Sequence, residues 1–240
     1  MNGSDDILAA LTRLVSGRAA VRRPVLLGVT GSVAVGKSSF AERVRAALEP
    51  DIAVEIVSTD SFLFPNDVLA ERGQLLRKGF PETFDIGALA AFVAAMRVGE
   101  PAVTVPVYDH ATFDVVPGQH RLIGDADVVL LEGVVLPDGL DLVIYLDAAT
   151  ADIERWFTDR FVEQVGRAAD SPGGFYDMFV GMSEPEVRDV AGWTWREINL
   201  PNLSEHIAPT RADADLVITK AADHTFSGAE LTRGGPWGKT

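Results

Sequence analysis

Eight consecutive residues, Gly31 to Ser38, combine glycines, a lysine and a serine at a spacing that suits phosphate chemistry. They match the pattern G-x-x-x-x-G-K-[ST] without a mismatch. Glycines let the backbone curl so that several N–H groups point at one anion. Lys37 could reach the β- and γ-phosphates of a nucleotide, and the Ser38 hydroxyl could bind Mg²⁺. The alternative is a plain glycine-rich turn, but the apolar run before it and the helical pattern after it favour a nucleotide site. Its predicted contacts are Gly31, Ser32, Val33, Ala34, Val35, Gly36, Lys37, Ser38 and Ser39.

Two carboxylates follow apolar runs in a way that suits metal binding and proton transfer. Glu132 closes the run 128–131, where it could hold Mg²⁺ opposite Ser38. Asp60 follows the run 52–57, where it could orient an attacking hydroxyl and accept its proton. Each also has an ordinary interpretation, a surface glutamate at a strand end and a turn or N-cap aspartate. The phosphate-binding pattern favours the catalytic interpretation of both.

A second group of residues could bind the substrate or the transferring phosphate. A predicted helix over 150–168 carries Arg155 and Arg160, either of which could offset charge that develops during transfer. Spacing alone does not separate them, although a solvated helix face suits Arg155 better. His110 follows the extended segment 103–108 and could bind a carboxylate or hydroxyl, or be an ordinary histidine.

The elements that must position these residues alternate between strands and helices. Continuous apolar runs predict strands that are buried on both faces of a parallel sheet. The strands are expected at 25–29, 52–57, 103–108, 128–131, 142–146 and 216–218, and the helices at 5–18, 39–48, 86–98, 150–168 and 185–199. The pattern indicates an α/β fold of the P-loop NTPase type, with a doubly wound, mainly parallel sheet flanked by helices and a helical lid. Because ligands bind at the carboxyl ends of such strands, the candidate residues are expected to meet there.

Capping residues and composition divide the chain into one main domain, an N-terminal segment and a C-terminal segment. Residues 1–24 are expected to form a helix, N-capped by Ser4 or Asp5, and a linker. Residues 25–226 form the domain, with the lid at about 150–180. Asp85 is the expected N-cap of the 86–98 helix and Gly99 its end. Residues 227–240 are glycine-rich and are expected to be a loose tail.

Composition excludes several function classes. Lys and Arg total 21 against 35 Asp and Glu, a net charge of −14, which argues against binding duplex nucleic acid or an anionic membrane through bulk charge. The chain has no cysteine, which excludes disulfides and thiolate catalysis. No apolar stretch is long enough for a membrane span and the first residues are acidic, so a cytoplasmic location is expected.

Several segments together resemble the bacterial type I pantothenate kinase family, within the phosphoribulokinase and uridine kinase superfamily. One of these segments is the loop 31–38, with the particular residues at its variable positions. The others run in order along the chain and are Ser58–Asn66, Glu71–Gly73, Lys78–Asp85, Pro106–His110, Leu131–Gly133, Trp156–Phe161, Trp195–Asn202 and Pro209–Arg211. They cover about residues 25–224, nearly the whole domain.

This resemblance implies a P-loop kinase that uses ATP and Mg²⁺ to phosphorylate the primary hydroxyl of pantothenate, the first step toward coenzyme A. By position, Asp60 matches the catalytic carboxylate, while Lys37 and Ser38 match the phosphate and Mg²⁺ ligands. The acceptor would lie against Asp60, Tyr108, His110, Phe113, Arg160 and Asn202. The choice between the two arginines falls on Arg160, and a homodimer is also implied.

The chain departs from the family pattern around the acceptor. Phe113 and Phe157 stand where the family has tyrosines, Gln164 and Ala169 where it has aromatic residues, and Ser61 where it has glycine. Two other hypotheses therefore stay open. One is a kinase of uridine or of another metabolite hydroxyl, and the other is a nucleotide-binding regulator without transfer activity.

Overall fold

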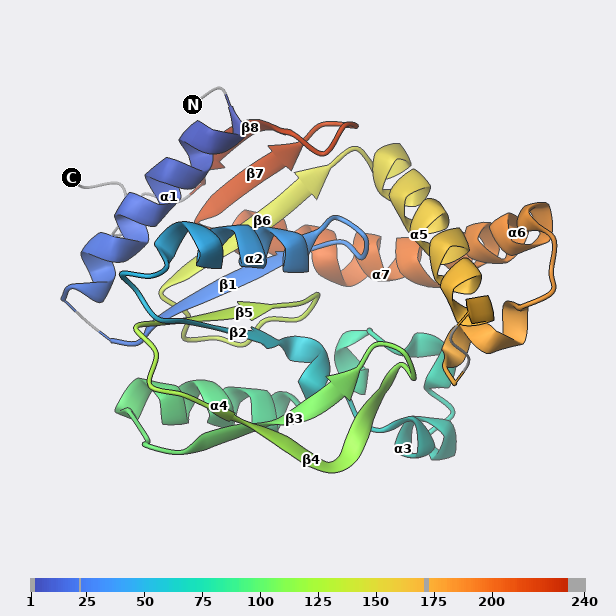
Figure 1. Cartoon of the computed structure of the whole chain (residues 1–240), viewed down its shortest axis with the longest axis horizontal. Helices are drawn as coiled ribbons and strands as arrows, with labels where there is room; N and C mark the ends of the chain where they lie inside the picture. The colour runs from blue at the N-terminus through green and yellow to red at the C-terminus, as the bar shows by residue number, and fades with distance from the viewer. Residues whose placement is uncertain (1–2, 22, 171–172, 233–240) are drawn as a thin grey trace.

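A six-stranded sheet lies at the centre of the molecule (Figure 1). The computed structural model describes residues 3–21, 23–170 and 173–232. Within them the strand order is β2-β5-β1-β6-β7-β8. The first five strands run parallel and β8 runs antiparallel to β7. Their bounds are β1 Val25–Gly31, β2 Val54–Ser58, β5 Val128–Glu132, β6 Leu142–Ala148, β7 Leu216–Lys220 and β8 Phe226–Leu231. The predicted α/β class, with a mainly parallel sheet, is confirmed.

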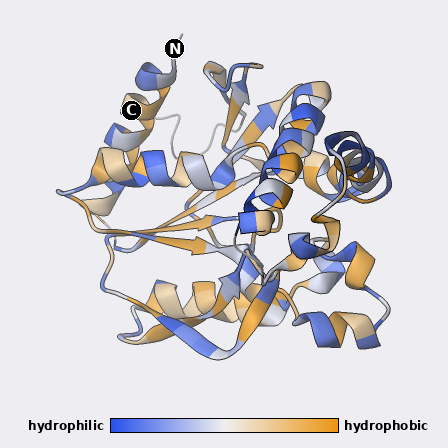
Figure 2. Cartoon of the chain, turned by 45° about the vertical axis from the view of Figure 1, so that its right-hand side comes forward, coloured by the Kyte–Doolittle hydropathy of each residue, from blue (hydrophilic) through white to orange (hydrophobic). Residues whose placement is uncertain are grey.

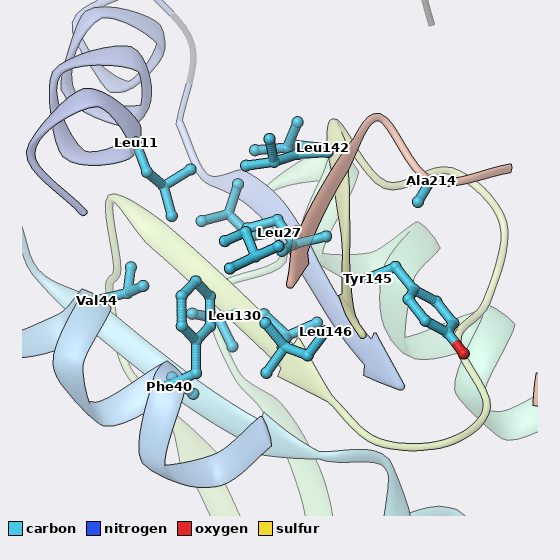
Figure 3. Packing of buried hydrophobic residues seen from close by; sticks show 14 of the residues in the cluster. Leu11, Leu27, Phe40, Val44, Leu130, Leu142, Tyr145, Leu146 and Ala214 are labelled. Atoms are coloured by element: carbon cyan, nitrogen blue, oxygen red, sulfur yellow. The ribbon is translucent and has the colours of Figure 1, made fainter. Parts of the chain in front are cut away.

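Helices cover both faces of this sheet, which explains why its central strands are largely apolar. All seven residues of β1 are buried, and the central strands are orange in Figure 2. Leu27 faces the first core, in which helices α1 (Ser4–Ala19) and α2 (Lys37–Leu48) place Leu11 and Phe40 (Figure 3). The next residue, Leu26, faces the second core beneath helix α4 (Ile86–Val98). Alternate side chains along one strand thus fill two separate cores.

A second, two-stranded sheet lies beside α4. It pairs β3 (Val103–Asp109) with β4 (Asp114–Ile123) in antiparallel fashion, and the two form a hairpin whose turn spans residues 110–113. The sequence pattern predicts an extended segment over 103–108 but no strand at β4. Most of β4 is exposed, so its sequence lacks the apolar pattern of a buried strand.

The helical segments after β6 lie at the carboxyl end of the sheet (Figure 1). Helix α5 (Thr150–Asp170) and the 3₁₀ segment Phe175–Phe179 occupy the region predicted as the lid. Helix α6 (Glu184–Thr194) continues through the π-helical segment Trp195–Asn199, the short helix α7 (Leu200–Asn202) and a second π-helical segment, Leu203–Ile207. A short helix, α3 (Asn66–Glu71), lies near the hairpin.

Local signals at the helix ends were partly right. The Asp85 side chain accepts a hydrogen bond from the Ala88 N–H at 2.8 Å, and Gly99 ends α4 in the left-handed region, as predicted. The N-cap of α1 is Gly3, so the expectation of Ser4 or Asp5 was wrong. The Ser4 hydroxyl instead accepts a hydrogen bond from the Phe226 N–H at 2.8 Å.

The expected loose tail at 227–240 was wrong for its first residues. Residues 226–231 form β8, because their backbone groups pair with β7. Residues 233–240 lie outside the described part of the chain. Among the described helices, none has the length and apolar composition that crossing a membrane requires.

Candidate active site

The loop between β1 and α2 has the backbone geometry of a phosphate cradle. Gly36 precedes α2 with φ +92°, and Gly31 has φ +139°. A Cβ on Gly31 would lie 2.4 Å from the Leu146 carbonyl oxygen, so both conformation and space require glycine there. The Lys37 ammonium donates to the carbonyl oxygens of Gly31 at 3.2 Å and Ser32 at 2.9 Å. The first N–H groups of α2 therefore point toward the hollow of the loop, where an anion is favoured.

The Ser38 hydroxyl and the Glu132 carboxylate meet at the edge of this loop. Ser38 Oγ donates to Glu132 Oε1 at 3.1 Å, and Glu132 is only 6% exposed. Burial raises the pKa of Glu132, and the nearby Asp60 carboxylate raises it further, while Lys37 opposes both. A hydroxyl beside a buried carboxylate is an oxygen donor set that suits Mg²⁺. The predicted pair is thus brought together.

Asp60 lies between the phosphate loop and the β3 side of the site. It stands in the 3₁₀ turn Thr59–Phe62, directly after β2. Its charge influences the pKa of Lys37 and of Glu132 on the loop side, and of Lys78 and Tyr108 on the other. A carboxylate in this position can touch a hydroxyl that approaches the end of the phosphate loop.

Arg160, and not Arg155, faces the phosphate loop. Desolvation lowers the pKa of Lys37, and the charge of Arg160 lowers it further, so the two cations lie near each other. Arg160 also lines a cavity together with Gly36. Arg155 is half exposed; it pairs with Asp152 at 3.0 Å on its own helix and donates to the Ala222 carbonyl. Two cations beside one loop suit an anion of high charge.

Tyr108 and His110 lie at the end of β3, with ring centroids 5.1 Å apart. Burial raises the pKa of Tyr108, and the Asp60 charge adds to this effect, so the phenol is protonated. Phe113 follows in the turn of the hairpin with φ +55°. Its ring lies 5.0 Å from that of Phe175 and 5.4 Å from that of Tyr176. These aromatic contacts join the hairpin to the segment 150–180.

A backbone contact strengthens this junction, which we call the latch. The Phe175 N–H donates to the Ala111 carbonyl oxygen at 2.9 Å. A Cβ on Gly174 would lie only 2.4 Å from the same oxygen. The latch therefore consists of Gly174 and Phe175 on one side and Ala111 and Phe113 on the other. It lies at the end of the hairpin, close to Tyr108 and His110.

Asn202 reaches the site from the far end of the chain. It is 4% exposed, and its Nδ2 donates to the Gly79 carbonyl oxygen at 2.9 Å. Its Oδ1 has no hydrogen-bond partner among the described groups, which leaves an acceptor atom free. The two π-helical segments on either side of α7 set the position of this side chain.

Lys78 is a site residue that sequence reasoning did not single out. Its ammonium donates to Asn66 Oδ1 at 2.6 Å and also to the Phe113 carbonyl oxygen, and it lies 5.3 Å from the centroid of the Tyr108 ring. Burial lowers its pKa, while Asp114 and Asp60 oppose this shift. The one feature of the sequence that could have indicated Lys78 is that it lies in the segment Lys78–Asp85, which resembles the family pattern.

A cavity of about 480 Å³ opens beside the phosphate loop and was also missed. Its walls include Arg43, Trp156, Lys220, His224 and Phe226. The His224 ring stacks on Trp156 at 4.4 Å, and Lys220 donates to the Val35 carbonyl oxygen at 2.6 Å. Flat aromatic walls next to a phosphate loop suit a nucleobase. The signal for Lys220 was its place at the end of β7, at the same edge of the sheet as the loop.

A phosphate-binding loop with Ser38 and Glu132 paired at its edge, and with Asp60 and Arg160 beside it, is the arrangement of a P-loop kinase, an ATP-dependent phosphotransferase that acts on an alcohol. Comparison with known proteins gives the particular family. The chain belongs to the Phosphoribulokinase / Uridine kinase family, whose model matches residues 26–161.

Relatives with assigned names give a narrower similarity. The chain is 43% identical to a pantothenate kinase of Sorangium cellulosum over 232 residues, which cover 90% of the chain and 75% of the relative. It is 42% identical to a pantothenate kinase of Streptomyces coelicolor over 229 residues, which cover 88% of the chain and 70% of that relative.

Solved structures show the same fold. A kinase from Silicibacter sp. TM1040, named for a fructose transport system, has a TM-score of 0.66 at 26% identity and covers 82% of this chain and 92% of its own. The D-glycerate 3-kinase of Cryptococcus neoformans also has a TM-score of 0.66, at 14% identity, and covers 94% of this chain and 99% of its own.

Proposed function

We propose that this protein phosphorylates the primary hydroxyl of pantothenate with ATP and so opens coenzyme A synthesis. The observation that carries the proposal is the convergence of Lys37, Glu132 and Asp60 at the end of the phosphate loop. The names of the most similar relatives support pantothenate as the acceptor.

The phosphate loop holds the triphosphate in this mechanism. The backbone N–H groups of residues 31–39 surround the phosphates, and Lys37 exchanges its bonds to loop carbonyls for bonds to phosphate oxygens. Ser38 and Glu132 would hold Mg²⁺, which would supply positive charge to offset that of the phosphates. The cavity beside Trp156 and His224 takes the base.

Asp60 acts on the acceptor. Its carboxylate orients the hydroxyl and accepts the proton as the oxygen attacks the γ-phosphorus. Arg160 and Lys37 offset the charge on the transferring group. Both cations are neighbours of the loop, so neither has to travel far.

The remaining contacts hold the acceptor in place. The protonated Tyr108 phenol and the His110 ring offer hydrogen bonds on the β3 side, and Asn202 offers its free Oδ1. Phe113 supplies an apolar wall. The segment 150–180 is the lid of the domain 25–226, and the latch keeps it over the acceptor, which excludes water that would otherwise hydrolyse ATP.

The test is ADP release by purified protein with and without pantothenate, compared between wild type and Asp60→Asn. We expect pantothenate-dependent release that falls roughly 10²–10⁴-fold in the variant. Asp51→Asn, an exposed aspartate in the loop between α2 and β2, serves as a control of unchanged rate. No pantothenate-dependent release by wild type would remove this acceptor, and an unchanged rate in D60N would remove the role of the carboxylate.

A second acceptor class has its own support. Phe113 and Phe157 lack the hydroxyls, and Gln164 and Ala169 the rings, that the family pattern places around pantothenate. A panel of nucleosides and other primary alcohols tests this alternative, and a kcat/KM tenfold above that for pantothenate would establish it. A nucleotide-binding regulator would release no ADP with any acceptor of the panel.

The assembly and location of the enzyme complete the proposal. We propose a homodimer in the cytoplasm, without nucleic-acid or membrane partners, on the basis of the family resemblance and the acidic charge of −14. Light scattering of the purified protein at several concentrations measures the assembly. A constant monomer mass would exclude the dimer.

A further inference from the structure

Thr59 and Gly133 are in unusually close contact beside the two carboxylates of the site. They follow Ser58 and Glu132, which are register partners on the neighbouring strands β2 and β5. A Cβ on Gly133 would lie 1.7 Å from Thr59 Oγ1 and 2.9 Å from Thr59 Cβ. Thr59 is completely buried, and its hydroxyl has no hydrogen-bond partner among the described groups. Thr59 and Gly133 are thus held together by van der Waals packing and not by a hydrogen bond from the Thr59 hydroxyl.

The reason for glycine at position 133 is this contact and not its backbone conformation. Gly133 is outside the left-handed region that favours glycine, so an alanine would suit its φ. Its N–H donates to the Val29 carbonyl oxygen at 3.1 Å, which holds its backbone to β1. The backbone of Gly133 therefore forms a fixed wall, and the Thr59 side chain rests against it.

Ser58 links the Glu132 carboxylate to the backbone of Asp60 through hydrogen bonds. Its hydroxyl accepts from the Asp60 N–H at 3.4 Å and also forms a hydrogen bond with the Glu132 carboxylate. Asp60 and Glu132 are like charges that repel each other across the site. Neighbouring residues must hold the two carboxylates at a set separation. The reason is that Glu132, the proposed metal ligand, and Asp60, the proposed proton acceptor, act on the same phosphoryl transfer.

We propose that Ser58, Thr59 and Gly133 form a clasp that fixes Asp60 relative to Glu132. Each of the three lies next to one of these carboxylates in the chain or touches it, so they are positioning residues for phosphoryl transfer. The inference rests on the proposed function for its rate measurement. It does not depend on which alcohol is the acceptor.

Gly133→Ala tests the clasp most directly. The added methyl has to push Thr59 away or shift Gly133, and either movement displaces a carboxylate. We expect kcat to fall roughly 10²-fold, as for a misplacement of about 1 Å. The KM for ATP should rise far less than kcat falls, since the loop and Lys37 are untouched. Gly17→Ala is the matched control, because a Cβ there meets nothing within 4 Å and Gly17 lies in the last turn of α1, outside the residues assigned to the site.

A second substitution separates positioning from a general loss of structure. Thr59→Ala removes Oγ1, the atom of closest contact, and leaves only the Cβ at 2.9 Å. In the double variant G133A/T59A we expect kcat to recover at least tenfold over G133A. Thermal unfolding of each variant is measured beside the rates. A kcat in G133A equal to wild type would overturn the proposal, and so would a double variant that recovers thermal stability without recovering kcat.

Nucleotide binding gives a readout that needs no acceptor. A non-hydrolysable ATP analogue is titrated by calorimetry with and without Mg²⁺. In G133A we expect the same affinity without Mg²⁺ and a smaller gain on adding Mg²⁺, because Glu132 is displaced. If wild type phosphorylates no alcohol, the proposed function fails while this titration still decides the clasp. An unchanged gain would overturn it.

Ser58→Ala covers the case in which Gly133→Ala does not fold. It removes one hydroxyl and adds no atom, and we expect kcat to fall about tenfold and the Mg²⁺ concentration for half-maximal rate to rise. Wild-type values of both in S58A would refute the clasp even without a folded G133A.

Discussion

The latch between the lid and the β3–β4 hairpin is sensitive to one methyl group. Gly174 has φ −127°, so alanine suits its backbone conformation. The added Cβ would nevertheless lie 2.4 Å from the Ala111 carbonyl oxygen, a backbone atom with little freedom to move. Gly174→Ala must therefore separate the lid from the hairpin at this point. The hydrogen bond from the Phe175 N–H to Ala111 is lost with it.

The size of the effect follows from the contacts that the separation breaks. One backbone hydrogen bond contributes about 1 kcal/mol. The ring pairs of Phe113 with Phe175 and with Tyr176 contribute roughly 1 kcal/mol each. Together this is about 3 kcal/mol, or roughly 100-fold in the ratio of latched to open molecules. We expect the acceptor KM to rise at least tenfold and ADP release without acceptor to increase, because water then reaches the site.

The assay is coupled ADP release over a range of acceptor concentrations and also without acceptor. Gly166→Ala on α5 is the control, since a Cβ there meets nothing within 4 Å. The acceptor KM and the ratio of hydrolysis to transfer should both change in G174A. Neither quantity should change in G166A. If G174A keeps the wild-type KM and ratio, the latch does not govern access to the acceptor site.

Three further substitutions test other parts of the structure. Arg160→Met should lower kcat by roughly 10²–10³, whereas Arg155→Met should leave it within twofold; equal losses would contradict the choice of Arg160. Lys220→Met should raise the dissociation constant of ATP about tenfold in a fluorescence titration, because the buried ammonium supports the loop, and unchanged binding would refute this role. Leu130→Ala should lower the free energy of unfolding in urea by about 2–5 kcal/mol, and exposed Leu122→Ala by less than about 0.5; similar values would contradict the assigned core.

Sequence patterns predicted the parts of the fold that depend on local chemistry or on burial from both sides. The phosphate loop needs glycine at positions of positive φ, and that requirement is visible in the sequence at Gly31 and Gly36. Residues 128–131, which precede Glu132 in β5, are all apolar because helices cover both faces of this strand. Helix α4 was bounded correctly because Asp85 and Gly99 act within one turn of its ends.

The missed features depend on contacts between distant segments. Strand β4 has a largely exposed pattern, and only its pairing with β3 makes it a strand. Lys220 and His224 belong to no recognisable motif in the sequence. Only the position of β7 in the sheet places them at the nucleotide cavity. Lys78 has the same character, since its partners Asn66 and Phe113 lie 12 and 35 residues away. The hydrophobic periodicity of a short segment carries no information about contacts with residues so far away in the sequence.

The position of Phe226 has a consequence for synthesis of the enzyme on the ribosome. Its ring packs against Phe40 and under Arg43, both on α2, and it forms one wall of the cavity assigned to the base. Its backbone N–H is held by the Ser4 hydroxyl, so the two extremities of the described chain meet at this wall. A nascent polypeptide can build its phosphate loop early, but it cannot assemble the full nucleotide cavity until β8 has left the exit tunnel. Tight retention of ATP is thereby a property that newly made molecules acquire only after β8 has emerged from the ribosome.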